Sequence, residues 1–243
     1  MTDLLIDSGN SRMKLARCAS EGIELMATLD FDDAAMPERF ERILNGHGFE
    51  RIVLASVSKG RRAGQLDALL ASVELPVLRV ASCATLGRLQ VAYPVPSQLG
   101  VDRFLALLAA GETLEPCLLL SFGTALSVMM RHADGRPRGG VIAPSPTLQL
   151  QAMRAGFPGL FEDDGRITML ADNTRDALTS GIAHQCIGMI ERIHAQAFER
   201  RDARIWVSGG AASQWLPYLP AGSQLAEDIL FRGMRRYLQL TGS

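Results

Sequence analysis

The sequence has no excess of charge of either sign. Its 243 residues include 25 Lys and Arg and 26 Asp and Glu, which gives a formal net charge of −1. A chain without a positive field has no general attraction for nucleic acid or for an anionic membrane surface. We therefore expect no nucleic-acid partner. Lysine is nearly absent, with Lys14 and Lys59 as its two examples, and we interpret the dominance of arginine as a compositional bias.

Cysteine is scarce and dispersed. The four cysteines, Cys18, Cys83, Cys117 and Cys186, form no C-x-x-C pair. This spacing excludes the common zinc and dithiol redox motifs and a dense disulfide framework. The pattern indicates buried thiols in a reducing environment, so we expect a cytoplasmic protein.

Long hydrophobic runs are also missing. The apolar, uncharged run of residues 116–130 is interrupted by polar residues and is too short to span, since a membrane helix needs about 20 apolar residues. The opening residues, MTDLLIDSGNSRMK, have an acidic third position and no apolar signal core. The sequence therefore predicts no membrane association.

The sequence does contain ample apolar material and a small surplus of glycine. Hydrophobic residues make up 47% of the chain and the mean hydropathy is +0.10, which excludes wholesale disorder and a fibrous repeat. Glycine accounts for 23 residues, slightly above the usual share of about 7%. Glycine is needed where backbone turns sharply or approaches a ligand, so these positions direct the search for a site.

The pattern of apolar residues predicts alternating strands and helices. In the first half, the expected strands are 4–6, 13–18, 23–29, 51–57 and 76–81, and the expected helices are 37–44, 63–73 and 101–110. In the second half, the expected strands are 117–120, 125–131 and 204–207, and the expected helices are 173–201, 212–219 and 225–240. Each half opens with a strand, a glycine turn and a second strand. We therefore predict an α/β protein of two domains, residues 1–111 and 112–243.

The first glycine turn is Asp7-Ser8-Gly9-Asn10-Ser11, with Lys14 shortly after it. Gly9 allows consecutive N–H groups to point into one concavity, an anion-binding nest, and Asn10 and Ser11 add side-chain donors. Asp7 would then be placed to hold Mg²⁺, because this ion usually takes one or two carboxylates plus phosphate oxygens. Taken alone, the same residues are more simply explained as an ordinary hairpin turn.

Three further glycine turns accompany the first. Ser121-Phe122-Gly123-Thr124-Ala125 repeats its arrangement at the start of the second half, Gly139-Gly140 follows a charged segment, and Ser208-Gly209-Gly210-Ala211 lies between a strand and a helix. Two facing turns, one from each domain, would grip a polyphosphate from both sides. Each turn alone could equally be a plain connection. None matches the fingerprint of a P-loop or of a dinucleotide-binding Rossmann unit.

Gly100-Val101-Asp102-Arg103 opens an apolar helix. An aspartate in the first helical turn complements the helix dipole, so a structural role is the default interpretation. Asp102 could instead be a base that orients and deprotonates the hydroxyl of a phosphoryl acceptor, with Arg103 binding an anionic acceptor or the transferring phosphoryl group. The histidines have no metal-ligand spacing and are interpreted as structural or surface residues. They are His47, His132, His184 and His194.

Together these motifs resemble the type III pantothenate kinase family. The Asp7–Ser11 turn is similar to its first phosphate motif, D-x-G-N-[ST], and residues 99–103 are similar to its G-x-D-R motif. Gly123-Thr124-Ala125 matches the core of its second phosphate motif, and residues 139–144 are similar to its G-G-x-I-x-P stretch. Asn173-Thr174 with Gly181 is similar to its N-T segment and the glycine after it. The motifs occur in the family's order over nearly the whole chain.

The resemblance implies two ribonuclease H-like domains of the acetate/sugar kinase, heat-shock cognate and actin-like (ASKHA) fold, working as a homodimer. It implies ATP-dependent phosphorylation of pantothenate, the first step towards coenzyme A, with Asp102 as proton acceptor. The residues implied to line the ATP phosphates and Mg²⁺ are Asp7, Ser8, Gly9, Asn10, Ser11, Arg12, Met13 and Lys14, with Thr124 as a further ATP contact. The residues implied to contact pantothenate are Tyr93, Gly100, Val101, Asp102, Arg103 and Thr174, the last from across the dimer interface.

Four positions depart from the family pattern. Ser121 stands where the family usually has an aspartate that ligates a monovalent cation, and Met129 replaces another acid; Ser127 and Ser145 replace threonine and glycine. Losing a carboxylate removes charge that a bound cation needs, which weakens the case for a dependence on K⁺ or NH₄⁺. The losses are compatible with reduced activity.

Two alternatives to pantothenate kinase stay open. One is a non-catalytic nucleotide-binding regulator, since relatives resembling this family have been described as accessory transcription factors. The retained Asp7, Asp102 and Arg103 argue against it. The other is a different small-molecule kinase on the same fold, which the region of Tyr93 would decide.

Overall fold

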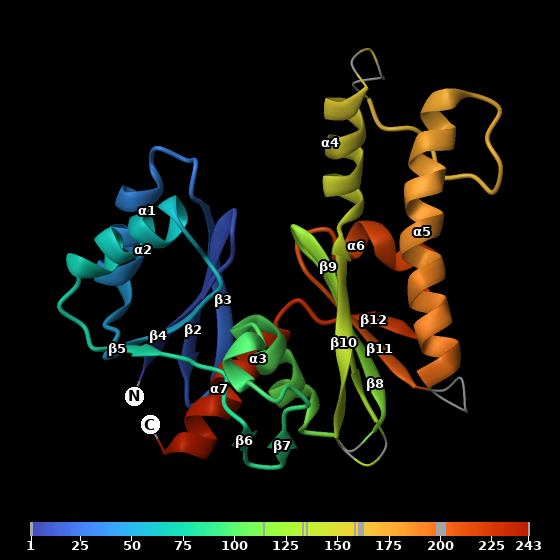
Figure 1. Ribbon diagram of the computed structural model, residues 1–243. Coiled ribbons are helices and arrows are strands. Elements are labelled where there is room, and N and C mark those ends of the chain that lie inside the picture. The colour runs from blue at the N-terminus through green and yellow to red at the C-terminus, as the bar shows by residue number, and fades with distance from the viewer. Residues whose placement is uncertain are drawn as a thin grey trace. The chain divides into compact units, whose positions relative to one another are not determined.

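The computed structural model describes residues 2–113, 115–132, 134, 136–157, 159, 163–197 and 203–242 (Figure 1). The chain divides into two compact units: unit 1 is Met1–Thr113 with Asp228–Ser243, and unit 2 is Leu114–Glu227. The chain first passes from unit 1 to unit 2 after Thr113, close to the boundary expected at residue 111. The C-terminal segment, expected in the second domain, groups instead with unit 1.

Unit 1 is built around a five-stranded sheet in the order β3-β2-β1-β4-β5. β1 is antiparallel to β2 and parallel to β4. The strands are β1 (Asp3–Ser8), β2 (Arg12–Ala19), β3 (Gly22–Asp30), β4 (Arg51–Ser56) and β5 (Val77–Arg79), with a separate small hairpin of β6 (Thr85–Leu86) and β7 (Leu89–Gln90). The helices are α1 (Met36–His47), α2 (Arg61–Ala71), α3 (Val101–Ala110), α7 (Ile229–Thr241) and the 3-10 turn η1 (Pro96–Gln98).

Helices cover both faces of this sheet. Alternate strand residues such as Leu4 and Ile6 pack with Phe40 of α1 and Leu66 of α2 in one buried cluster. On the other face α3 contacts β4 and α7 contacts β1 (Figure 1). The last helix belongs to unit 1 because its apolar face, with Phe231, Met234 and Leu238, is buried there against α3. Periodicity predicts such a face but does not say which partner covers it.

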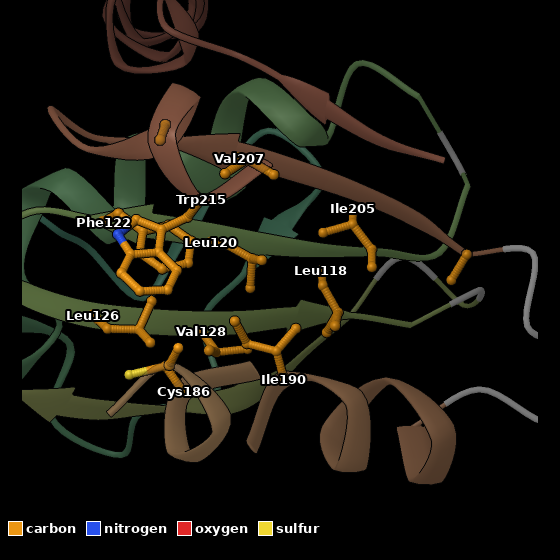
Figure 2. Close-up of a cluster of buried hydrophobic side chains, with 13 residues drawn as sticks. Leu118, Leu120, Phe122, Leu126, Val128, Cys186, Ile190, Ile205, Val207 and Trp215 are labelled. Atoms are coloured by element: carbon orange, nitrogen blue, oxygen red, sulfur yellow. The ribbon is translucent and has the colours of Figure 1, made fainter. Parts of the chain in front are cut away.

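Unit 2 repeats the plan with the order β10-β9-β8-β11-β12. Its strands are β8 (Cys117–Phe122), β9 (Ala125–Arg131), β10 (Pro137–Pro144), β11 (Arg204–Ser208) and β12 (Ser223–Leu225). Its helices are α4 (Pro146–Gly156), α5 (Thr174–Ala197), α6 (Ala212–Trp215) and the 3-10 turn η2 (Leu216–Tyr218). Figure 2 shows the core between the sheet and α5, where Leu120 and Val128 pack against Cys186 and Ile190.

The two sheets agree residue by residue at their centres. Asp7 lies opposite Lys14 on the antiparallel neighbour and opposite Ala55 on the parallel neighbour. Ser121 lies opposite Ser127 and Ser208 in the same sense. Ser121 therefore occupies the place in unit 2 that Asp7 occupies in unit 1. The expectation of an α/β fold in which each half opens on a strand, a glycine turn and a second strand is confirmed.

The predicted elements are confirmed in most places, and the differences have physical causes. Gly139-Gly140, expected as a turn, lies within β10, where the pairing register shifts between Pro137 and Gly140. Because paired glycines usually mark a turn, the sequence pattern does not predict β10. It also does not predict α4 or β12. Part of the expected helix 173–201 lies outside the described residues. Among those that are described, no helix combines the length and apolar character needed to cross a membrane.

Candidate functional site

The first glycine turn connects β1 and β2 in unit 1. The Gly9 N–H donates to the Arg12 carbonyl at 3.0 Å, which closes the turn and leaves Asn10 and Ser11 exposed on its tip. Ser8 and Met13, on either side, are fully buried. Met13 lies in the core, so any contact it makes with a ligand at the turn would come from its backbone. The turn thus presents polar groups from residues 9–11 on a rigid strand pair.

Asp7 is a half-buried carboxylate next to this turn, with half-buried Lys14 across the strand pair. Burial raises the pKa of Asp7 from 3.8 to about 6, and the negative charge of Asp102 adds to this rise, while Lys14 opposes it. Desolvation is the largest of these effects because removing water disfavours the charged form. The surroundings of Asp7 therefore disfavour its ionised form, and a bound cation would favour that form.

Asp102 lies in the first turn of α3, where Gly100 precedes the helix. A Cβ on Gly100 would lie 2.5 Å from Asp102 Oδ1 and 3.4 Å from Arg103 Nη2. Both charged side chains fold back over the Gly100 backbone, so a side chain at this position would displace the Asp102 carboxylate. The structure therefore brings Asp7, Lys14, Asp102 and Arg103 into one electrostatic neighbourhood within unit 1, although they are distant in sequence.

Arg103 is fixed by Tyr93, which lies in the connection before α3. Its Nη1 donates to the Tyr93 hydroxyl at 2.8 Å, and its guanidinium lies 5.7 Å from the centre of the Tyr93 ring. Ser82 donates its hydroxyl to the Leu99 carbonyl at 2.7 Å and holds the backbone just before Gly100. Val101, by contrast, is buried and supports the helix. A planar, oriented guanidinium of this kind suits an anionic group.

The second glycine turn connects β8 and β9 in unit 2. The Gly123 N–H donates to the Ala125 carbonyl at 3.1 Å, and Thr124 is exposed. Gly209 has φ +98°, and a Cβ there would lie 2.5 Å from the carbonyl carbon and oxygen of Phe122. The loop after β11 therefore lies directly against this turn, and the Ala211 N–H donates to the Phe122 carbonyl at 3.2 Å.

Neutral residues stand at the positions that depart from the family pattern, and each has a defined position in the fold. Ser121, Ser127 and Ser208 form a row across three neighbouring strands, and Met129 is buried. Ser145 is the N-cap of α4 and accepts the Leu148 N–H at 3.2 Å. Serine is a preferred N-cap residue, so this departure has a stabilising role.

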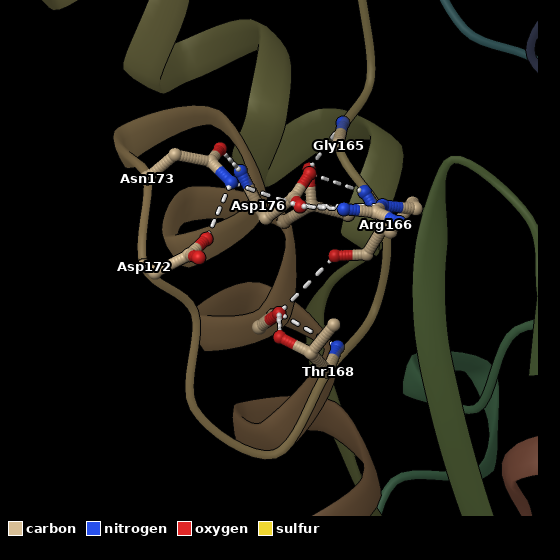
Figure 3. A network of polar contacts seen from close by, with 8 residues as sticks. Gly165, Arg166, Thr168, Asp172, Asn173 and Asp176 are labelled. Atoms are coloured by element: carbon tan, nitrogen blue, oxygen red, sulfur yellow. Dashed lines mark hydrogen bonds and ion pairs between the residues drawn. The ribbon is translucent and has the colours of Figure 1, made fainter.

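Thr174 is exposed at the start of α5 and follows Asn173, which belongs to a polar network that Figure 3 shows. The Asn173 side chain accepts the Asp176 N–H at 2.9 Å and caps the helix. The buried Asp176 accepts from the Arg166 N–H at 2.8 Å and from the Arg166 guanidinium at 3.2 Å. Of this network the sequence predicts only Asn173, and the network fixes the loop that precedes Thr174.

The donor set fits one kind of metal better than others. Within the described ranges, no group of three or more His, Cys, Asp or Glu side chains is arranged to hold a metal ion. Mg²⁺ needs no such cage, because it is usually held by one or two carboxylates together with phosphate oxygens and water. The Asp7 carboxylate, whose pKa burial raises, lies next to the first glycine turn and fits this requirement.

Comparison with known proteins decides the family. The model of the family described as type III pantothenate kinase matches residues 3–196. The chain belongs to the type III pantothenate kinase family. A type III pantothenate kinase of Xanthomonas campestris pv. campestris (strain B100) is 35% identical over 237 residues, which cover 95% of each chain. One of Stenotrophomonas maltophilia (strain K279a) is 32% identical over 98% of this chain and 97% of its own. Members of this family are kinases, so the expectation of an enzyme is confirmed.

Solved structures show the fold. A Baf family transcriptional activator of Campylobacter jejuni has a TM-score of 0.63 and is 17% identical, and the match covers 98% of each chain. A 2-dehydro-3-deoxygalactonokinase protein of Sinorhizobium meliloti has a TM-score of 0.58, is 15% identical and covers 97% of this chain, with 98% of its own length matched. At these identities the likeness concerns architecture alone. The two α/β units, each with a five-stranded sheet, have the expected ASKHA fold.

Proposed function

We propose that this protein transfers the γ-phosphoryl group of ATP to pantothenate, giving 4′-phosphopantothenate in the first step of coenzyme A biosynthesis. The observation that carries this proposal is the grouping of Asp7, Asp102 and Arg103 around one turn of unit 1, in a member of this kinase family. Two carboxylates and a guanidinium are the parts that phosphoryl transfer to a hydroxyl requires.

Asp102 is proposed as the base. Its carboxylate would accept the proton of the pantothenate hydroxyl as the hydroxyl oxygen forms a bond to the γ-phosphorus. The bond from that phosphorus to the β,γ-bridging oxygen breaks at the same time, and ADP leaves. Placement supports this role, because the carboxylate folds back over Gly100 instead of extending along the helix surface. Holding the two reactants in this geometry supplies much of the catalysis.

Asp7 and the two glycine turns are proposed to hold MgATP. Asp7 would ligate Mg²⁺, which supplies neutralisation of phosphate charge when bound. Residues 8–14 would contact the phosphates, and Thr124 is proposed as a further nucleotide contact. We propose no dedicated K⁺ or NH₄⁺ site, since Ser121 offers a hydroxyl where the family usually has a carboxylate.

Acceptor binding is assigned to Tyr93, residues 100–103 and Thr174. The hydrogen bond from Arg103 to Tyr93 supports this assignment, because it orients the guanidinium for the carboxylate of pantothenate. Thr174 is proposed to act across a homodimer interface, and the protein is proposed to work in the cytoplasm.

Production of ADP in the presence of ATP, Mg²⁺ and pantothenate tests the proposal. We expect turnover that requires pantothenate and that falls by about 100-fold or more in Asp102→Asn, because a general base contributes roughly 10²–10⁴. The matched control is Glu38→Gln, which removes another first-turn acid, paired at 2.8 Å with Arg42. If Asp102 only complements the helix dipole, the two variants will have similar, near-normal activity.

The alternatives give different results in the same assay. A likeness to a Baf family transcriptional activator keeps the non-catalytic regulator in view. If the protein binds nucleotide but does not phosphorylate pantothenate, whichever monovalent cation is supplied, the result would favour that regulator. ADP production with another small-molecule acceptor but not with pantothenate would favour a different kinase.

A further inference from the structure

Ser58 lies in the loop between β4 and α2 and contacts the first glycine turn through its hydroxyl. Its Oγ lies 2.6 Å from the Gly9 carbonyl oxygen and 2.9 Å from Ser8 Oγ. The Ser58 N–H donates to Ser56 Oγ at 3.3 Å, and the neighbouring Val57 N–H donates to the Ser8 carbonyl at 3.0 Å. The loop after β4 is therefore hydrogen-bonded to the turn through two consecutive residues, Val57 and Ser58.

The direction of these hydrogen bonds follows from the number of hydrogens. A serine hydroxyl has one hydrogen, and a carbonyl oxygen can only accept. The short contact with the Gly9 carbonyl therefore takes the Ser58 hydrogen, and the Ser8 hydroxyl donates its own hydrogen to Ser58 Oγ. The result is a chain of two hydroxyls ending on the Gly9 carbonyl. Each hydrogen bond in such a chain strengthens the next.

Fixing the Gly9 carbonyl also fixes the next amide group. In a trans peptide the C=O of one residue and the N–H of the following residue point in opposite directions. Because the Gly9 carbonyl faces Ser58, the Asn10 N–H points away from the β4–α2 loop. The Ser8–Gly9 peptide is held in the same manner, with its carbonyl on Val57 and its N–H on Arg12. Two successive peptide planes of the turn are thus locked.

We propose that Ser58 is a positioning residue for nucleotide phosphate, which acts by holding the Asn10 N–H in the orientation that binds a phosphate oxygen. This inference rests on the proposed function in so far as the turn binds the phosphates of ATP. It assigns to Ser58 no contact with the nucleotide itself. Preorganised N–H donors bind an anion more tightly than donors that must first be ordered.

The test compares Ser58→Ala with Ser58→Thr, which keeps the hydroxyl. The matched control is Ser72→Ala, which removes a hydroxyl that donates to the Leu69 carbonyl at 2.8 Å at the end of α2, away from the turn. For each variant we would measure the Kd of a non-hydrolysable ATP analogue with Mg²⁺ in the absence of pantothenate, the KM for ATP, the KM for pantothenate and the Tm.

We expect Ser58→Ala to weaken binding of the ATP analogue and to raise the KM for ATP by about tenfold, since it loosens a donor to a charged group. The KM for pantothenate and the Tm should stay close to those of the Ser72→Ala control. Ser58→Thr should bind the analogue within about threefold of the parent protein. This pattern separates positioning from general support of the fold, which would lower the Tm and change both KM values.

The outcomes are distinguishable from the fate of the proposed function. If the parent protein phosphorylates pantothenate but Ser58→Ala binds the analogue normally, the inference is overturned and the function stands. If the parent protein binds the analogue but does not phosphorylate pantothenate, the proposed function fails, and the tenfold loss in Ser58→Ala still supports the inference. A parent protein that does not bind the analogue would overturn both.

Discussion

The two units share one sheet topology and register but carry different side chains at equivalent positions. At the end of the central strand, unit 1 has Asp7 facing Lys14, whereas unit 2 has Ser121 facing Ser127 in the same register. The first pair is charged, and burial raises the pKa of Asp7 to about 6. The second pair is neutral. The comparison teaches that the repeated sheet fixes where the groups lie, while the side chains assign the charge to unit 1.

The opposite ends of the central strands differ as well. In unit 1, buried Asp3 accepts two hydrogen bonds from its neighbour Arg51, at 2.8 and 3.0 Å. In unit 2 the place of Asp3 is taken by Cys117, and its neighbour Arg204 pairs instead with Glu115 at 2.6 Å. Burial raises the pKa of Cys117 to about 11, so its thiol stays neutral. At equivalent positions, unit 1 thus has a carboxylate in an ion pair, whereas unit 2 has a neutral thiol.

The glycine turns are also fastened differently. The residue before the glycine is Ser8 in unit 1, which bonds to Ser58 through its hydroxyl at 2.9 Å. In unit 2 it is Phe122, whose ring stacks on Trp215 with centroids 5.9 Å apart. One turn is held by polar contacts and the other by aromatic packing and by Gly209.

The largest expected effect comes from removing the charge that distinguishes unit 1. Asp7→Asn should lower kcat/KM for MgATP by about 100-fold or more, because it removes the proposed ligand of Mg²⁺. Ser121→Ala, the equivalent change in unit 2, should cost less than about threefold. Steady-state kinetics with purified variants checks both. Similar losses in the two variants would mean that the units share the charged role.

Next in size is the difference between the turns. Gly209→Ala should destabilise unit 2 by about 3 kcal/mol or more, because a Cβ collides with the Phe122 backbone at a φ that L-residues rarely adopt. Gly9→Ala should cost about 1 kcal/mol or less, since its Cβ would lie 3.4 Å from the Arg12 carbonyl oxygen.

Urea unfolding measures this difference by region. Both tryptophans of the chain, Trp206 and Trp215, lie in unit 2, so their fluorescence follows that unit alone. Circular dichroism follows both units. A normal fluorescence transition in Gly209→Ala would contradict the close approach of the loop to the turn.

A smaller effect concerns the stability of unit 1 and its pH dependence. The folded protein holds the Asp7 proton more tightly than the unfolded chain does, since the pKa rises from 3.8 to about 6. Ionisation of Asp7 therefore destabilises the fold as the pH rises from about 4 to about 6, and the cost is complete above that range. Asp7→Asn should be more stable than the parent protein by about 1–3 kcal/mol at pH 7.5, with the difference disappearing near pH 4.

Circular dichroism of urea unfolding without nucleotide, at several pH values, checks this prediction, with the tryptophan transition of unit 2 as an internal reference. An Asp7→Asn variant that is less stable at pH 7.5 would show that the Lys14 contact outweighs the cost of burial. The activity of the parent protein should also decline as the pH falls below about 6, because protonated Asp7 is a poor ligand for Mg²⁺.

The smallest effect is expected from the monovalent cation. Replacing Na⁺ by K⁺ at constant ionic strength should change the activity by less than about twofold, because the position of Ser121 carries no charge. Ser121→Asp should make the activity respond to K⁺, since a carboxylate supplies the charge that the cation needs. Strong activation of the parent protein by K⁺ would show that the serine row binds the cation without a carboxylate.

The sequence by itself determined the α/β class, most strands and helices, and the family. These follow from local information: apolar periodicity, glycine punctuation and short motifs such as Asp7–Ser11 and Gly100–Arg103. Local information failed at Gly139-Gly140, where glycines lie inside β10 because an edge strand tolerates a register shift. It also placed the last helix with the wrong half, because an amphipathic face does not name its partner.

Only the tertiary structure decided which distant residues act together. It placed the Asp102 charge close enough to Asp7 to raise the Asp7 pKa, oriented Arg103 on Tyr93, and set the hydroxyl of Ser58 on the Gly9 carbonyl. It also showed that Ser121 is the counterpart of Asp7, through strand register. The reason is physical: burial, charge coupling and hydrogen-bond direction depend on separations in space, and parallel pairing brings together segments that the sequence keeps far apart.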